Sequence, residues 1–313
     1  MQLASLQAKE LAPDLPRLTT TVPKEYVHRA CLAEVFLTGC TKQGETQFAL
    51  SGQWPRAHTF FQSFDGTGHD PLLTAETFRQ AGLFLAHAEL GVPLGHHFVM
   101  WELGFSTELD RLDIGHSPTD VELTATCTDI TRRGGRATGF RMELSIRRDG
   151  EAIAVGGGRF TVISPAVYRR LRGARLTCDV SALRGIPRRA LPPSAVGRAR
   201  AADVVLSPAD GPNRWLLTPD PTHPVLFDHT GDHHPGMVLL EAARQAACAL
   251  VTPMTVVPSA ISTVFHRYAE LDEPCVVEAV FAASQEHDQV TVEVTGRQNG
   301  ESVFTSVLTG LLS

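Results

Sequence analysis

Three side chains that could take part in ionic or acid–base chemistry stand close together in an apolar stretch, residues 233–247. Glu241 precedes Arg244 by three residues and Gln245 by four. On a helix these spacings place all three on one face. The residues around them are apolar on nearly every side, which is typical of a buried helix. A carboxylate in such a helix must be paired, neutralised or used in a reaction.

The same triplet occurs earlier in the chain, where Glu76, Arg79 and Gln80 repeat the pattern E-x-x-R-Q-A. A histidine, one further residue and a proline precede both copies. The first histidine is His69 and the second is His233, with one extra residue in the second copy. We therefore expect two related buried helices. In a duplicated enzyme, one of the two sites often loses its activity.

Glu241 is the first candidate for a catalytic group. Partial burial can raise the pKa of a carboxyl group towards working pH, which suits a general base. The alternative is an ordinary ion pair with Arg244. Glu76 with Arg79 has the same spacing, and the same two interpretations apply to it.

The start of each helix offers further candidates. His233 could act as a base or orient a substrate, or it could be a loop histidine that caps backbone groups. His69 is the corresponding candidate in the first copy. The backbone amides of Gly236 and Met237 at the helix start suit an oxyanion or a phosphate. No serine or cysteine lies in a G-x-S-x-G context, which favours direct transfer over a covalent intermediate.

Arginines at equivalent positions in the two copies are candidates for binding an anionic substrate. The planar guanidinium group fits a phosphate well, although a structural salt bridge is the commoner role of an arginine. With the two helix glutamines, the predicted substrate-binding side chains are Arg29, Arg79, Gln80, Arg198, Arg244 and Gln245.

We expect no metal and no cofactor. The acidic and histidine residues at 228, 229, 232, 233 and 234 match no metal-ligand spacing. The six cysteines are scattered and contain no C-x-x-C pair, so they indicate neither a zinc site nor a disulfide framework.

Composition narrows the class of protein. The 313 residues are 43% hydrophobic and 20% charged, as in a globular protein. A net charge of −6 argues against a general nucleic-acid binder. No run of about 18 apolar residues predicts a membrane span. Because residues 1–24 show no signal-peptide pattern, we expect a cytoplasmic location.

An internal duplication extends beyond the helices. Val27–Leu37 and Val196–Leu206 both read V-x-R-A-x-x-A-acid-V-x-L. Each helix is followed by alternating apolar and polar segments, separated by Gly-Gly, Asp-Gly or Asn-Gly or by a turn near His287-Asp288, which predicts antiparallel hairpins. The predicted strands are 121–130, 139–146 and 152–163 in the first copy, and 275–284, 289–296 and 302–312 in the second.

These elements predict an α+β fold, a tandem or double hot-dog. In each repeat an antiparallel sheet wraps around one long central helix and buries it on most sides. We assign residues 1–24 to an N-terminal tail, 25–165 to the first repeat, 166–195 to an Arg- and Pro-rich linker and 196–313 to the second repeat. The linker arginines could receive an acidic partner protein or could simply be solvated: Arg169, Arg170, Arg172, Arg175, Arg188 and Arg189.

The stretch from Asp232 to Ala247 resembles the A-factor synthase (AfsA) family of actinomycetes. The opening Val27-His28-Arg29-Ala30 and the segment Glu76–Met100 resemble the first repeat of that family. The stretch Pro235–Ala242 is also similar to the helix of hot-dog 3-hydroxyacyl-carrier-protein dehydratases, in which an acidic residue is catalytic. His234 departs from the family pattern, which has an apolar residue there.

The resemblance implies a β-ketoacyl transferase. Such enzymes move a β-ketoacyl group from an acyl carrier protein to a hydroxyl of dihydroxyacetone phosphate, on the way to γ-butyrolactone, butenolide or furan signalling molecules. Two other functions stay open from the residues. One is a hot-dog dehydratase or thioesterase acting on acyl thioesters, and the other is a non-catalytic acyl-binding or regulatory protein. The sequence contains no helix-turn-helix pattern, which argues against a DNA-binding regulator.

Overall fold

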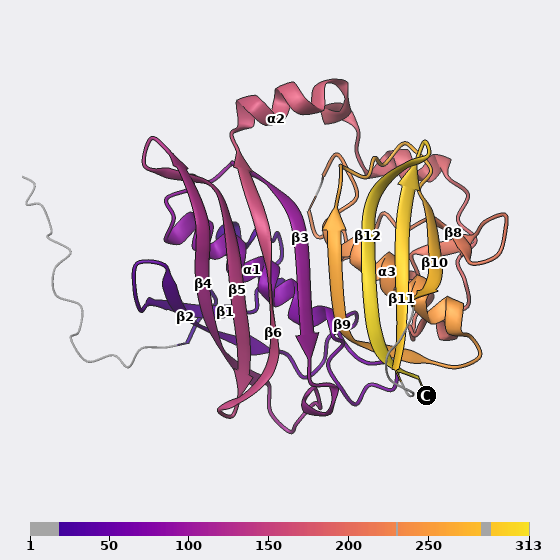
Figure 1. Ribbon diagram of the computed structural model, residues 1–313, viewed down its shortest axis with the longest axis horizontal. Helices are drawn as coiled ribbons and strands as arrows, with labels where there is room; N and C mark the ends of the chain where they lie inside the picture. Colours follow the sequence, from indigo (N-terminus) through magenta and orange to yellow (C-terminus); the bar gives the residue numbers. More distant parts are fainter. Residues whose placement is uncertain (1–18, 230, 283–288, 313) are drawn as a thin grey trace, which may run out of the picture.

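The computed structural model describes residues 19–229, 231–282 and 289–312. Three α-helices and twelve strands are found in these ranges (Figure 1). The helices are α1 (Leu72–Ala88), α2 (Pro165–Arg172) and α3 (Gly236–Val251). The strands of the first half are β1 (Leu37–Lys42), β2 (Gln47–Trp54), β3 (His97–Thr107), β4 (Thr119–Arg133), β5 (Arg136–Arg148) and β6 (Glu151–Ile163). Those of the second half are β7 (Leu206–Pro208), β8 (Arg214–Leu217), β9 (Val256–Phe265), β10 (Val276–Ala282), β11 (Gln289–Gln298) and β12 (Glu301–Leu312).

All twelve strands belong to one sheet, and its order reveals the duplication. The order is β1-β2-β4-β5-β6-β3-β9-β12-β11-β10-β8-β7. From either edge inwards, each strand of the first half occupies the position of the strand six numbers later in the second half. The halves join where β3 and β9 pair antiparallel, from Glu102 opposite Val264 to Ser106 opposite Ala260. The sequence prediction of a tandem hot-dog is confirmed.

The predicted hairpins form where the turn residues stand. Asp149-Gly150 and Asn299-Gly300 both have positive φ at each residue, which is the backbone that a tight two-residue hairpin turn requires. The strands that they join run one to three residues beyond most of the predicted ends because the alternation of buried and exposed residues continues into the turns. The turn predicted near His287-Asp288 lies outside the described residues.

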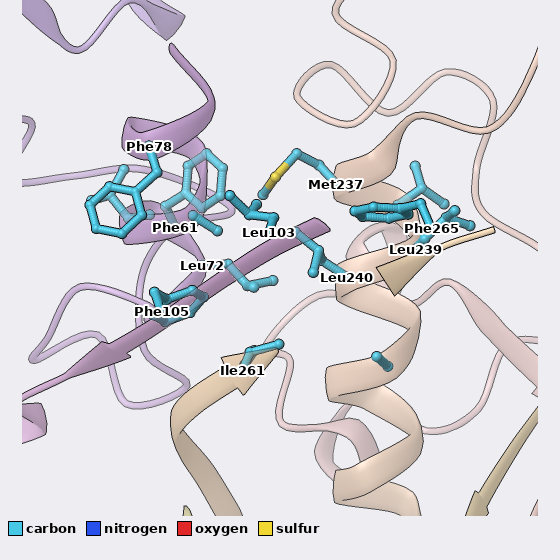
Figure 2. Packing of buried hydrophobic residues seen from close by; sticks show 14 of the residues in the cluster. Phe61, Leu72, Phe78, Leu103, Phe105, Met237, Leu239, Leu240, Ile261 and Phe265 are labelled. Atoms are coloured by element: carbon cyan, nitrogen blue, oxygen red, sulfur yellow. The ribbon is translucent and has the colours of Figure 1, made fainter. Parts of the chain in front are cut away.

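The two long helices lie on the same face of the sheet and are buried along most of their length (Figure 1). Figure 2 shows side chains of the two repeats meeting between these helices, with Leu72 of α1 near Leu240 of α3. Both leucines are fully buried. One continuous core therefore spans the two repeats, and the repeats cannot separate without exposing it to water.

The connection between the repeats is structured. Short helix α2 is capped by the Ser164 side chain and is followed by 3₁₀ turns at Gly173–Thr177, Val180–Gly185 and Pro193–Val196. Figure 1 shows α2 above the ends of the central strands, between the two halves of the sheet. Further 3₁₀ turns cover Lys24–Val27, Leu32–Glu34, Leu109–Arg111 and Ala201–Asp203. Within the described ranges, no helix has the length and apolar character that crossing a membrane would need.

Candidate active site

Glu241 is fully buried between two arginines (side-chain exposure 0%). Arg198 donates to both carboxylate oxygens at 2.7 and 2.6 Å, and Arg244 donates to them at 2.9 and 2.7 Å. Burial alone would raise the pKa of Glu241, but the two guanidinium groups outweigh it and lower the pKa to about 2. Glu241 is therefore an ionised partner of two cations at neutral pH.

This finding differs from the raised pKa that we expected for a general base. Arg198 comes from the 3₁₀ region before β7, 43 residues away in the chain, and nothing in the spacing of the helix residues reveals its contact. Glu76 has the same surroundings. Its partners are Arg29 at 2.7 Å and Arg79 at 2.8 Å, and its pKa is also lowered to about 2, because the two arginines again outweigh the effect of burial. Both carboxylates hold ion-pair clusters.

The two glutamines tie each helix to the segment that enters the sheet. Gln80 accepts a hydrogen bond from the amide of Phe36 and donates to the carbonyl of Glu34, at 2.9 and 2.7 Å. Gln245 makes the same pair of bonds with Val205 and Asp203, at 2.9 and 2.7 Å. Both glutamines are fully buried. Their contacts give them a scaffold role.

Residues 27–37 and 196–206 lead into the sheet and are called the entry segments below. The arginine of each entry segment, Arg29 or Arg198, also contacts the other repeat. Arg29 donates to the carbonyl of Val225 at 3.0 Å, and Arg198 donates to the carbonyl of Phe60 at 2.6 Å. Arg198 also pairs with Asp70, at 3.1 Å. The carboxylate clusters therefore join the two repeats to each other.

A cavity of about 570 Å³ lies between the repeats. Part of its wall is apolar and suits an acyl chain; this part includes Leu83, Phe98, Met100, Phe160, Ile163, Leu239 and Phe265. The rest carries groups that can donate or accept hydrogen bonds: His28, Arg29, Arg79, His97, Trp101, Thr161, Tyr168, His229, His233, His234, His266, Arg267 and Tyr268.

The cavity brings together some of the predicted site residues and not others. Predicted residues on its wall are Arg29, Arg79, His233, Gly236 and Met237. Those outside the lining are His69, Glu76, Gln80, Arg198, Glu241, Arg244 and Gln245. The wall therefore combines the start of α3, from the second repeat, with the arginine face of α1, from the first.

His69 occupies a different place from the one that the shared H-x-P pattern indicated. Its amide donates to the carbonyl of Leu112 at 2.7 Å, and the amide of His234 donates to Ala269 in the same way at 2.8 Å. His69 thus corresponds to His234 and not to His233, without an extra residue in the second copy. Its Nε2 lies 3.0 Å from the hydroxyl of Thr119, away from the cavity.

His233 is held by a carboxylate in the way a general base requires. Its Nδ1 lies 2.7 Å from Oδ1 of Asp232, and its side chain is 31% exposed. Asp232 also accepts hydrogen bonds from the Tyr168 hydroxyl at 2.5 Å and from Arg172 at 2.8 Å. These hydrogen bonds outweigh burial and lower the pKa of Asp232, so it stays ionised. An imidazole whose Nδ1 donates to a fixed carboxylate presents Nε2 as a proton acceptor.

The start of α3 lies beside this pair. Pro235 occupies the cap position and supplies no side-chain bond, and the amides of Gly236 and Met237 belong to the first turn, where no intrahelical acceptor exists. His234 is buried, with no hydrogen-bond partner for either ring nitrogen among the described residues. Burial lowers its pKa to about 3. The Tyr268 hydroxyl is likewise buried without a partner in the described part of the chain. These unpaired groups suit a polar ligand.

Sequence reasoning missed three residues of this site. Tyr168 comes from the segment assigned as a linker and stacks on His97, with 3.6 Å between the ring centroids. No pattern in the sequence pointed to it. Asp232 was considered only as a metal ligand. His28 could have been found, because the duplicated segment has a glycine at the corresponding position, Gly197. Within the described ranges no three His, Cys, Asp or Glu side chains are grouped to hold a metal ion.

The fold and the site define a double hot-dog protein with one partly apolar, partly cationic cavity at the junction of its repeats. Solved structures share this architecture. A 12:0-ACP thioesterase from Umbellularia californica aligns with 85% of this chain and 94% of its own (TM-score 0.50, 11% identity). A trans-AT PKS dehydratase domain from Brevibacillus brevis aligns with 88% and 97% (TM-score 0.51, 13% identity). At these identities the likeness concerns the fold alone.

The chain belongs to the AfsA family, the A-factor biosynthesis hotdog domain, whose sequence profile matches residues 11–164 and 181–312. A protein of Streptomyces virginiae is 46% identical over 93% of this chain and 98% of its own length. A relative in Streptomyces coelicolor is 38% identical over 96% of this chain and 94% of its own length. A relative in Streptomyces griseus is 40% identical over 91% of this chain and 94% of its own length. All three carry the name 2-oxo-3-(phosphooxy)propyl 3-oxoalkanoate synthase. The resemblance found in the sequence is confirmed.

The carboxylate clusters predict a stability effect. Replacing Glu241 with Gln leaves Arg244 buried without its carboxylate partner and leaves Arg198 with Asp70 alone, and we expect the free energy of unfolding to fall by about 3–5 kcal/mol. Urea denaturation followed by circular dichroism measures it. Glu122→Gln, at an exposed position on β4, is the matched control and should change stability by less than about 0.5 kcal/mol. Equal effects of the two substitutions would contradict the prediction.

The clusters also predict how stability depends on pH. The pKa values of Glu76 and Glu241 are lowered from 4.5 to about 2. Their contribution is therefore complete above pH 4.5 and is lost as the pH falls from there towards 2. Unfolding free energies measured between pH 6 and pH 3 should decline less steeply in Glu241→Gln than in the unmodified protein. Parallel pH profiles would show that Glu241 does not titrate in this way.

Proposed function

We propose that this protein transfers a 3-oxoacyl group from a thioester to the hydroxyl of dihydroxyacetone phosphate, forming a 2-oxo-3-(phosphooxy)propyl 3-oxoalkanoate. The observation that carries this proposal is the cavity between the repeats, which has one wall for an alkyl chain and another for a phosphate. The synthase name of the relatives, at up to 46% identity over nearly the whole chain, supports the same reaction.

The cationic wall supports binding of the phosphate end. Arg29 and Arg79 line the cavity, whereas their partner Glu76 is fully buried behind them. Nε and Nη2 of both arginines pair with Glu76, whose single negative charge offsets only one of the two positive charges at the cavity wall. Arginine at this place suits a phosphate because of its planar set of donors. The alkyl chain of the donor would lie along the apolar wall.

The α3 end of the cavity supports the transfer step. Nε2 of His233 would take the proton of the acceptor hydroxyl while the hydroxyl oxygen attacks the thioester carbon. The oxyanion that forms would accept hydrogen bonds from the amides of Gly236 and Met237. The C–S bond then breaks, and the thiolate takes the proton back from the imidazolium. Asp232 holds the ring orientation throughout.

The chemistry of the product fits the proposed route to a butenolide. The methylene group between the two carbonyls of the acyl part is acidic and can attack the ketone of the dihydroxyacetone part. That attack forms the carbon–carbon bond that closes a five-membered lactone, and loss of water from the resulting tertiary alcohol gives the unsaturated ring, which still carries the phosphate. Such a ring is the expected precursor of a γ-butyrolactone-type signalling molecule.

Incubation of the protein with a 3-oxoacyl thioester and dihydroxyacetone phosphate tests the proposal. Mass spectrometry should detect the phosphorylated ester or butenolide, together with free thiol. Thiol release without dihydroxyacetone phosphate would indicate a thioesterase, and loss of water from a 3-hydroxyacyl thioester would indicate a dehydratase. Absence of any product from folded protein over several chain lengths would overturn the proposal.

Replacement of His233 tests the general base. His233→Gln should lower kcat by roughly 10²–10⁴-fold, because proton transfer to a positioned side chain typically contributes that much. The exposed loop histidine His116 provides the control, and His116→Gln should leave kcat unchanged. A kcat for His233→Gln within two-fold of the unmodified enzyme would exclude the assigned role.

We also propose that the thioester arrives on an acidic acyl carrier protein that docks at α2. Leu171 and Tyr168 line the cavity from this helix, and Arg169 and Arg170 between them are exposed. Three other arginines of the connection are engaged, whereas Arg189 is exposed. Arg172 pairs with Asp232 and Glu270, Arg175 with Asp272 and Glu273, and Arg188 donates to three backbone carbonyls.

Charge reversal tests the docking site. The double variant Arg169→Glu, Arg170→Glu should raise KM for a carrier-bound thioester several-fold and leave KM for the free pantetheine thioester unchanged, because only the protein partner carries the acidic surface. The double variant Arg132→Glu, Arg133→Glu, at the exposed β4–β5 turn, is the control. An equal change for both donors would argue against docking at α2.

A further inference from the structure

His28 is a position at which the two entry segments differ in chemistry, because Gly197 stands there in the second repeat. The 3₁₀ turn Lys24–Val27 ends at His28, with φ 52° and ψ 52°, and the turn Pro193–Val196 ends at Gly197, with φ 63° and ψ 34°. Both residues are in the left-handed region, which glycine adopts without strain. A histidine held there costs backbone energy, and such strain is concentrated at functional sites.

The side chain of His28 is fixed by a chain of hydrogen bonds. Its Nε2 lies 2.9 Å from Nε2 of His87, and Nδ1 of His87 lies 2.9 Å from the carbonyl of Val92. Because a carbonyl only accepts, His87 must donate through Nδ1, and its neutral ring then accepts at Nε2. His28 therefore donates through Nε2 and keeps a lone pair on Nδ1, which has no partner among the described residues.

The groups that face His28 leave it short of negative charge. Arg79 and His87 face it from α1, His97 from β3 and His229 from the loop before α3. The nearby carboxylates are occupied. Glu76 pairs with two arginines, and Asp228 accepts from the amides of Ala30 and Cys31. Burial and then Arg79 lower the pKa of His28 to about 3, so the ring is neutral at pH 7.

We propose that His28 is a third phosphate ligand beside Arg29 and Arg79, and that the phosphate binds together with one proton shared with Nδ1 of His28. A dianion facing the lone pair of a neutral ring would be repelled. The contact becomes attractive when the ring takes a proton from solvent or when the phosphate keeps one of its own. No covalent bond changes. The proposal rests on the proposed function, because it assigns a place to the phosphate of that acceptor.

The second repeat shows what this position looks like without a ligand role. A Cβ on Gly197 would lie 3.1 Å from Nη1 of Arg244 and 3.5 Å from Sγ of Cys248. Arg244 therefore occupies the space beside Gly197, where the first repeat keeps the histidine on a cavity wall. Neither Gly197, Arg198, Arg244 nor Cys248 lines the cavity. A side chain at 197 would press on Arg244, and a glycine at 28 would leave a phosphate with two ligands.

Titration calorimetry of the whole protein with dihydroxyacetone phosphate tests the proposal. At pH 8 a phosphate monoester, with a second pKa of about 6, is a dianion. Measurements in two buffers of different ionisation enthalpy give the number of protons taken up per molecule bound. We expect roughly one for the unmodified protein and roughly zero for His28→Gly and His28→Gln. His116→Gln should behave like the unmodified protein.

Two further readings separate the outcomes. His28→Gly matches the glycine of the second repeat and should keep or raise the melting temperature, while its affinity for dihydroxyacetone phosphate falls roughly ten-fold or more. Equal proton uptake with and without the histidine, or an unchanged affinity in His28→Gly, would overturn the role of His28 even if transfer proceeds. Absence of both binding and transfer in the unmodified protein would instead overturn the proposed function.

Discussion

The structure depends on two buried carboxylates, each enclosed by two guanidinium groups. An ion in such surroundings is costly to desolvate, and only close, multiple hydrogen bonds offset that cost. Glu76 and Glu241 obtain these bonds from the next turn of their own helix and from an entry segment. The arginine of each entry segment also bonds to a carbonyl of the other repeat. The same hydrogen bonds therefore fix the position of each helix, the path of each entry segment and the docking of the two repeats.

The cavity follows from this arrangement. Arg29 and Arg79 of the Glu76 cluster line the cavity together with the start of α3, so the site combines residues of the first repeat with one helix start from the second. The α2 helix closes the same space by contributing Tyr168, whose hydroxyl bonds to Asp232. The Asp232–His233 pair is therefore held by residues of the connection as well as by its own loop. Three separate parts of the chain define one site.

Much of this could be predicted from the sequence, and for physical reasons. Hairpins were predictable because residues such as Asn299-Gly300 adopt positive φ more readily than others. The ionic triplets were predictable because helix geometry makes spacings of three and four adjacent. The role of Glu241 was not, because its pKa depends on Arg198, which only the tertiary fold brings close. The cavity was missed for the same reason: it lies between repeats, whereas periodicity reports on one segment at a time.

The pairing of β3 with β9 has a consequence for how the two ends of the molecule can differ. Where two identical chains meet along such a seam, every substitution appears twice, and any residue must suit both of its copies. A single polypeptide that carries both halves is free of that restriction. One half can hold a histidine in the left-handed backbone region while the other keeps a glycine there, so the two halves of a symmetric scaffold can differ in the side chains that they present.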